Sequence, residues 1–510
     1  MSNAPKSVSS QLIVLFKLAF PIILGNFAYA LLGITDIMMA GMAGTPDQAG
    51  VAIGGSFFFP ALTFIIGMVS AIHPVISRHR GAKTEEKIPS EHAHSVLACS
   101  IVGIIIMFIL ISLSIFAIEM DTDKRMEAVA KDYVLYIAFT IPLLALTVNA
   151  RAYCEAMGNT TATLYFGFLS VILNVPLNYI FIFGALGVPA LGGVGCGVAS
   201  LIAMLISTVI IYAYMMLHPK LKDHHWLRNK TGISKDRLLA FLKLSMPLGI
   251  SSSVECSCFT LIALILSPLG PTAVSAHTIT MSMTSFVFNI PLSFGIATAI
   301  MVGYAIGQNN MQTLKLNIKA AYASMLVSIV ISVSILFLGS DKLPAFFSTD
   351  PEVLALASIL MLFACVNQSF EGIQTIQAFI LRGFKDTTTI LLVTIIAFYC
   401  VALPLGYSLC YGYITLPFDH IFADTGLTGP RGFWIGLFCG LLTAAILYRF
   451  RVLHHYRALK HQLEQLDQPT QPTNATLTPK LKIKLTLKPP AKAPPLTRRG
   501  LCFHTLEPPS

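Results

Sequence analysis

Apolar runs of about 20 residues recur twelve times along this chain, and they constrain its fold more than any other feature. A run of that length crosses the hydrocarbon core of a bilayer as one α-helix. Hydrophobic residues make up 55% of the 510 residues and charged residues only 11%, against about 25% charged in a soluble domain. We therefore predict an all-α polytopic membrane protein with twelve transmembrane helices. The runs lie near 12–42, 51–77, 93–118, 133–153, 162–184, 192–217, 239–267, 274–303, 318–338, 353–381, 390–411 and 432–450.

Lys and Arg residues are unevenly distributed between the loops that join these runs. With the N-terminus placed in the cytoplasm, fifteen of them fall on the cytoplasmic side and five on the opposite side. Cytoplasmic loops of membrane proteins carry such an excess, so we predict that both termini are cytoplasmic. The formal net charge of +10 then reflects loops that face anionic lipid, and we expect no nucleic-acid partner.

The chain also repeats itself at an offset of six spans. The segment KLAFP, which ends at Pro21, returns in the second half as KLSMP, which ends at Pro247. Gly81 matches Gly307 at the same offset, and Asn159 matches Asp386 one residue further on. An even number of spans inserts both halves the same way up, which predicts two six-helix bundles related by a parallel pseudo-twofold axis, with the binding site between them.

The repeat sets the predicted domain organisation. The expected parts are an N-terminal six-helix lobe (1–217), a cytoplasmic linker (218–237), a C-terminal six-helix lobe (238–452) and a disordered cytoplasmic tail rich in Pro, Thr, Gln and Lys (453–510).

Three carboxylates, those of Asp36, Glu255 and Glu371, fall inside apolar runs. A carboxylate in hydrocarbon is costly, so such residues usually face a wet cavity and line an ion or substrate path. The alternative is a buried carboxylate paired with Arg or Lys from a neighbouring span, but no Arg or Lys lies at comparable depth in the runs. Carboxylates on three different spans favour transport coupled to a cation.

Two polar faces accompany the carboxylates. Asn367, Glu371 and Gln374 are spaced to lie on one side of the tenth span, and Asn174 and Asn178 on one side of the fifth. Hydrogen bonding between helices is the simpler explanation for one such stripe, worth about 0.6–2 kcal/mol per contact. Stripes in both halves, each with a carboxylate nearby, favour a divided cavity.

Motifs for catalysis are missing from the sequence. It contains no GxxxxGK[ST] loop, no HExxH and no GxSxG. We therefore expect neither an enzyme nor a bound organic cofactor, and binding and movement of a solute remain.

Several segments together are similar to one family. The string DIMMAG at 36–41 resembles the first-span motif of multidrug and toxic compound extrusion (MATE) transporters of the NorM type. The resemblance continues through about residue 450 in NVPLNY (174–179), LGGVGCGVA (191–199), PLG (268–270) with AH (276–277), LRGFKDT (381–387) and GFWIG (432–436).

The resemblance implies a two-lobed antiporter of a bacterial inner membrane that exports amphipathic cationic drugs and dyes in exchange for Na⁺ or H⁺. By the family pattern Asp36 is the protonatable residue of the N-terminal lobe, with Asn174 and Asn178 beside it. Glu255 and Glu371 form the cation site of the C-terminal lobe. Glu155 matches an acidic position in relatives, with a solvated role as the alternative.

Relatives commonly have Asp where this chain has Glu371 and Tyr where it has Asn367. We expect Na⁺ to be held by Glu255, Glu371 and the amide oxygen of Asn367, with H⁺ alone as the alternative. Gln374 joins Asn174, Asn178 and Glu155 as a candidate for the substrate cavity. The expected protein is monomeric in the bilayer. A lipid or polysaccharide-precursor flippase is the alternative function, and it requires a cluster of Arg or Lys in the cavity.

Overall fold

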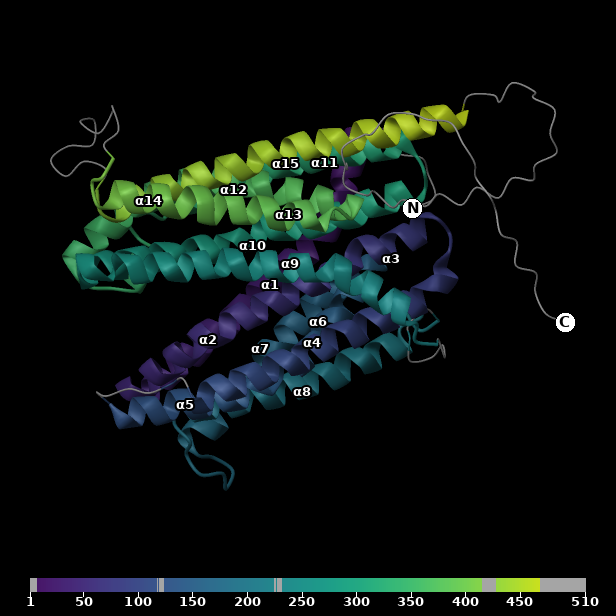
Figure 1. Ribbon diagram of the computed structural model, residues 1–510. Helices are drawn as coiled ribbons and strands as arrows, with labels where there is room; N and C mark the ends of the chain where they lie inside the picture. Colours follow the sequence, from purple (N-terminus) through teal and green to yellow (C-terminus); the bar gives the residue numbers. More distant parts are fainter. Residues whose placement is uncertain are drawn as a thin grey trace, which may run out of the picture. The chain divides into compact units, whose positions relative to one another are not determined.

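The computed structural model describes residues 7–116, 118, 123–223, 226, 232–414 and 428–467. Helices are the only regular secondary structure in these ranges (Figure 1). Eleven helical segments are long and apolar enough to cross a membrane, and the bent pair α5–α6 makes twelve, which confirms the predicted all-α architecture.

The first half of the chain supplies six of the twelve candidate spans. They are formed by α1 (Val8–Ala43), α2 (Thr45–Val69), α3 (Ile72–Gly81), η1 (Glu85–Lys87), α4 (Ile88–Phe116), α5 (Lys124–Ala138), α6 (Thr140–Ala156), α7 (Thr161–Phe183) and α8 (Val194–Leu217).

The second half repeats this succession. Its elements are α9 (Lys235–Leu266), η2 (Ser267–Leu269), α10 (Pro271–Gly307), α11 (Met311–Leu338), η3 (Pro344–Phe346), α12 (Pro351–Phe384), α13 (Thr387–Ile395), the π-helical η4 (Ile396–Ala402), α14 (Leu403–Cys410) and α15 (Pro430–Asp467).

Polar residues in the connections start many of these helices. The side chain of Ser7 accepts a hydrogen bond from the backbone of Ser10 at the start of α1. Asn310 does the same for Thr313 at the start of α11, and Asp386 for Thr389 at the start of α13. The first amides of a helix have no partner within the helix, so such caps fix where each span begins.

Prolines lie inside the helices where the sequence places them. Pro21 lies within α1, Pro60 within α2, Pro176 within α7 and Pro247 within α9. Pro291 lies likewise within α10, and Pro404 follows the π-helical segment η4. A proline removes one amide donor from the helix, and the wider π turn is one way in which a helix adjusts.

The internal repeat is visible in the backbone. The span formed by α2 and α3 covers 45–81, and α10 covers 271–307, so both bounds recur at the offset that relates Pro21 to Pro247. Lys83 and Asn309, which are repeat equivalents, both adopt a left-handed conformation with φ of 55° and 53°. The turns around them share the same hydrogen bonds, Thr84 N to His79 O and Asn310 N to Ala305 O. The repeat is therefore a property of the fold as well as of the sequence.

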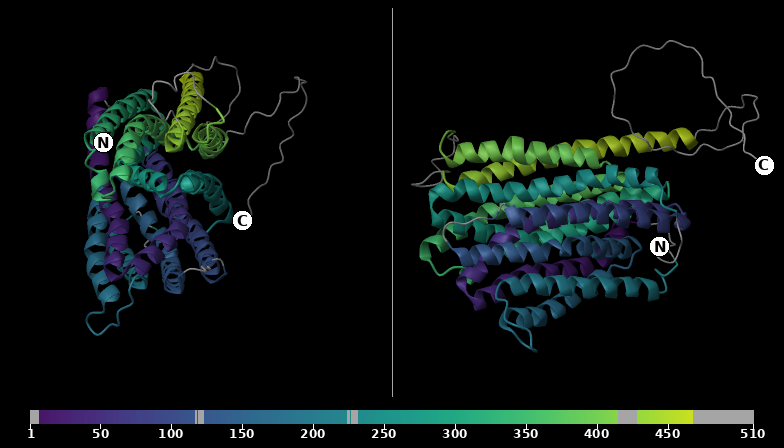
Figure 2. Two further views of the ribbon diagram at one scale, coloured as in Figure 1. Left: turned by 90° about the vertical axis from the view of Figure 1, so that its left-hand side faces the viewer. Right: turned by 60° about the horizontal axis from the view of Figure 1, so that its bottom comes forward.

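Helices α2 and α4–α8 gather on one side of the molecule and α10–α15 on the other, while α1 contacts both groups, through α7 in the first and through α10 and α11 in the second (Figures 1 and 2). Within the second group α10 packs along α12 and α11. The two halves of the chain meet where α2 contacts α9, and where α3 and α1 contact α10. These long helices pack lengthwise, so the spans lie roughly parallel to one another (Figure 2).

The helix α15 corrects one expected boundary. It continues to Asp467, so the stretch 453–467, expected to be disordered, is helical. Val452 is buried, and Tyr456 and Leu459 pack against the apolar core, which supplies the contacts that hold this extension. The rest of the predicted tail, 468–510, lies outside the described residues.

Candidate functional site

Asp36 lies buried in the first half, on α1, and is held by side chains from two other helices. Asn178 on α7 donates a hydrogen bond from Nδ2 to Asp36 Oδ1 over 2.6 Å. Ser200 on α8 donates from Oγ to Oδ2 over 3.2 Å. Asp36 as a residue is 8% exposed, so these donors replace the water that its carboxyl group has lost.

Asn174 completes this cluster. Its Oδ1 accepts a hydrogen bond from Asn178 over 3.0 Å, and its Nδ2 donates to Ser200 over 3.4 Å. The structure thus brings Asp36, Asn174 and Asn178 together, as the sequence predicts. Ser200 was not predicted, since a lone Ser in an apolar span gives no periodic signal.

In the second half, Glu255 on α9 faces α12. Gln374 donates from Nε2 to Glu255 Oε1 over 3.2 Å. Glu371, one helical turn before Gln374, lies close enough to Glu255 for their negative charges to repel each other. In the described part of the chain, neither of these glutamates nor Asp36 has an Arg or Lys nitrogen within 4.0 Å. The alternative of a direct salt bridge to Arg or Lys therefore fails for these three carboxylates within the described residues.

Arg382 corrects the expectation that no basic residue lies near these carboxylates. Its position at the end of the tenth span suggests a solvated turn, yet it is within electrostatic reach of Glu255. The guanidinium lies 3.9 Å from the ring centroid of Phe379, and that stacking draws it inward.

Asn367 is not joined to the carboxylates as expected. Its Nδ2 donates to the backbone oxygen of Trp434 on α15 over 3.0 Å and to that of Phe363 over 3.1 Å. Helix α15 covers this part of α12, so the amide nitrogen ties the two helices together. Its Oδ1 is buried and accepts no hydrogen bond from the described residues, which leaves one oxygen for a ligand.

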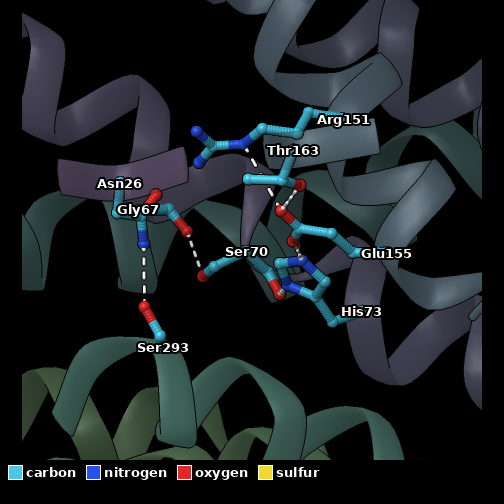
Figure 3. Close-up of polar contacts among 8 residues, drawn as sticks. All are labelled: Asn26, Gly67, Ser70, His73, Arg151, Glu155, Thr163 and Ser293. Carbon is cyan, nitrogen blue, oxygen red and sulfur yellow. Dashed lines mark hydrogen bonds and ion pairs between the residues drawn. The ribbon is translucent and has the colours of Figure 1, made fainter. Parts of the chain in front are cut away.

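Glu155 is fully buried on α6, and the solvated alternative for it is wrong. His73 on α3 places Nε2 2.7 Å from Glu155 Oε2 (Figure 3). Thr163 donates to Oε1 over 2.6 Å, and Arg151 Nε lies 3.5 Å from the same oxygen. Glu155 is 1% exposed, so it belongs to a buried polar network. No sequence pattern pointed to His73 as its partner, because the two residues lie far apart in the chain and on different helices.

We call the end at which α3 ends and α9 begins the basic end, because Arg78, Arg80, Lys83 and Lys385 lie there. Burial and the charge of Arg78 lower the pKa of Lys385 to about 8. The neighbouring Asp386 accepts from Arg451 Nε over 2.5 Å and lies 2.6 Å from His455 Nε2. Although burial opposes them, these hydrogen bonds hold the pKa of Asp386 well below its usual range.

The ligand atoms at the two carboxylate sites are oxygens from carboxylates, amides and a hydroxyl. No group of three or more His, Cys, Asp or Glu side chains suited to a metal occurs among the described residues. Oxygen donors of this kind suit hard cations or protons. Buried carboxylates without a direct ion pair also attract an organic cation.

A family model named MatE matches residues 21–180 and 247–408. The chain belongs to the MatE family. The two matched stretches begin at the repeat-related prolines, so each half of this MatE chain carries one copy of the family's domain. The chain is therefore a transporter and not an enzyme.

Curated relatives of this MatE chain match over nearly their whole length. The multidrug resistance protein NorM of Vibrio parahaemolyticus is 32% identical over 443 residues, which cover 86% of this chain and 95% of that protein. The multidrug resistance protein MdtK of Edwardsiella ictaluri is 31% identical over 439 residues, covering 86% and 94%.

Solved structures show the same fold at lower identity. The eukaryotic MATE transporter AtDTX14 superposes with a TM-score of 0.77 at 18% identity, covering 89% of this chain and 99% of that one. A multidrug resistance MATE family transporter in an outward-facing conformation superposes with a TM-score of 0.77 at 19% identity, covering 90% and 100%.

Proposed function

We propose that this MatE transporter exports amphipathic cationic compounds across a bacterial inner membrane in exchange for Na⁺ or H⁺. The observation that carries the proposal is the pair Glu255 and Glu371, neither of which has a hydrogen-bonded or ion-paired basic side chain among the described residues. Relatives named for multidrug resistance support the substrate class. Asp36 would serve the first half in the same way.

Competition for negative charge would couple the two solutes. An ion that binds the carboxylates from the outside neutralises them and lowers their affinity for a cationic drug, which then leaves. When the ion departs to the cytoplasm, the vacated carboxylates attract a new drug molecule. A ligand shifts the equilibrium between the outward-open and inward-open states only to the extent that it binds them with different affinities. The exchange therefore needs sites whose charge differs between the two states.

The proposed orientation places the basic end and both termini in the cytoplasm. It rests on the excess of Lys and Arg in the loops at that end. The proposed lobes remain 1–217 and 238–452 with the linker 218–237, and the protein would work as a monomer.

A panel of drugs tests the function most directly. The wild-type chain, expressed in a host without its own efflux pumps, should raise resistance to cationic dyes and fluoroquinolones. The matched control is the double variant Glu255→Gln/Glu371→Gln at equal membrane abundance. Wild-type cells that are no more resistant than the same host without the transporter would reject drug export, and transfer of a labelled lipid between leaflets would then favour the flippase alternative.

For the ion, we favour Na⁺. Na⁺ requires several oxygen ligands, and Glu255, Glu371 and the free Oδ1 of Asn367 offer them on adjacent helices. Everted vesicles loaded with a quenched dye should release it when Na⁺ is added at fixed pH. Release that needs a proton gradient and ignores Na⁺ would leave H⁺ as the coupling ion.

A further inference from the structure

The cytoplasmic-facing ends of α3 and α10 cross with almost no space between their backbones. A Cβ atom at Gly81 would overlap the carbonyl oxygen of Tyr304 and lie 2.9 Å from its carbonyl carbon. A Cβ atom at Gly307 would overlap the carbonyl oxygen of Arg78 and lie 2.9 Å from its carbonyl carbon. Only glycine allows two helices to approach this closely.

The two contacts are repeat equivalents of each other. Gly81 corresponds to Gly307, and Arg78 corresponds to Tyr304, both at the offset that relates the two halves. The contact of Gly81 with the Tyr304 carbonyl oxygen is therefore the repeat equivalent of the contact of Gly307 with the Arg78 carbonyl oxygen. The pseudo-twofold axis passes through this crossing, so both halves contribute equally to it.

Two arginines of α3 bind equivalent carbonyls in the two halves. Arg80 donates from Nη1 to the backbone oxygen of Ala156 over 2.8 Å, at the end of α6 in its own half. Arg78 donates from Nη2 to that of Gly383 over 2.8 Å, in the last turn of α12 in the other half. Since Ala156 and Gly383 are repeat equivalents, α3 is hydrogen-bonded to the ends of both α6 and α12. The bond of Arg78 connects the two halves.

Other links between the halves lie closer to the middle of the spans. Asn26 donates to Ser293 over 3.1 Å (Figure 3), and Ser253 donates to the backbone oxygen of Pro60 over 2.9 Å. Asn26, Pro60 and Ser253 lie near the middle of their spans, and Ser293 lies in the half of α10 nearer the basic end. Toward the opposite end the ribbons of α2 and α10 diverge (Figure 1).

We propose that the α3–α10 crossing is the gate that closes the cytoplasmic side of this transporter. Gly81 and Gly307 are its contact points, and the hydrogen bond from Arg78 to the backbone of Gly383 holds it closed. The name cytoplasmic rests on the orientation given under the proposed function. A carbonyl within a helix cannot move aside independently, so a Cβ at either glycine forces the helices apart. Packed interfaces between two rigid bodies switch between discrete arrangements, so this separation favours the conformer that is open at the basic end.

Distances between spin labels test the gate. Glu86 and Gln312 are exposed repeat equivalents that follow the two helices, so labels at Glu86→Cys and Gln312→Cys would flank the crossing. Accessible native thiols such as Cys400 would be replaced first. In lipid nanodiscs the parent should give a short distance by double electron–electron resonance.

Gly81→Ala and Gly307→Ala should each lower the ratio of short to long distances by about tenfold or more, because the overlap strains only the closed state. Arg78→Gln, which adds no bulk, should shift the ratio in the same direction. Gly33→Ala on α1 is the control, since a Cβ there meets no atom within 4 Å, and it should leave the distances unchanged.

The proposal is overturned if the labelled parent protein lacks the short distance between labels. It is also overturned if the two glycine variants and Arg78→Gln all retain that short distance. A shift in only one glycine variant overturns the equal contribution of the halves. If a glycine variant fails to fold, Arg78→Gln decides alone: a parent-like distance overturns the gate and a longer one supports it. Because the measurement needs neither drug nor ion gradient, its outcome is separate from that of the efflux panel.

Discussion

Gln374 on α12 and Glu255 on α9 are joined by a hydrogen bond of 3.2 Å between Nε2 and Oε1. The bond orients the Glu255 carboxylate toward the helix that carries Glu371, so two acidic side chains from different spans share one region. Like charges at short range repel in a medium of low dielectric constant. A cation bound here would relieve this repulsion, which is the physical basis of the proposed ion or drug site.

The glutamate pair leads to the first prediction. Glu255→Gln and Glu371→Gln should each lower resistance to cationic drugs by about tenfold or more, because each removes a charge that attracts the cation. Growth inhibition, with membrane abundance measured in parallel, checks this. Glu352→Gln, at an exposed position in the first turn of α12, should change nothing. Full resistance in either site variant would exclude the pair as the coupling site.

The donors around Asp36 lead to the second prediction. Asn178→Ala removes the shortest hydrogen bond to Asp36 and should cost about 1–3 kcal/mol of stability while also reducing export. Ser200→Ala should act in the same direction but less, since its bond is longer. Thermal unfolding in detergent and drug export are the measurements. Asn289→Ala is the control, because among the described residues that amide bonds carbonyls of its own helix, α10.

Glu155 leads to the third prediction. Glu155→Gln should lower the free energy of unfolding by about 1–3 kcal/mol, because its oxygens accept from Thr163 and pair with His73 in a buried site. His73→Ala should cost a similar amount, and the double variant should cost less than the sum, since both changes break one contact. Glu86→Gln, an exposed change in η1, serves as control. Additive losses would show that the two side chains do not interact.

The fourth prediction concerns pH and Asp386, which lies between α12 and α13. Its pKa is lowered in the folded state, so the carboxylate stabilises the fold above the unfolded pKa, about 4. That contribution should disappear progressively as the pH falls further toward the folded-state pKa. Thermal unfolding at neutral and acidic pH should therefore show a loss of stability that is smaller in Asp386→Asn. An identical acid response in both proteins would contradict the role of Arg451 and His455 as its partners.

Much of this protein could be read from local properties of the chain. Twelve spans follow from apolar runs, because each span alone must satisfy its backbone in hydrocarbon. The repeat is visible in the sequence from Pro21 and Pro247, and it reappears in the bounds of α10. Asn174 and Asn178 could be placed on one helix face because helical periodicity is local.

Contacts between distant helices were decided by tertiary structure alone. Asn367 and Gln374 lie on one side of α12 about two turns apart, yet Asn367 meets Trp434 on α15 while Gln374 meets Glu255 on α9, and periodicity cannot predict which helix covers each level. The depth of Arg382 and the burial of Glu155 depend on neighbouring helices that cover them. The crossing of Gly81 with Tyr304 requires two halves to close on each other. A sequence specifies which segments leave water, since that depends on their own composition, but partners across helices are set by packing, which belongs to the whole fold.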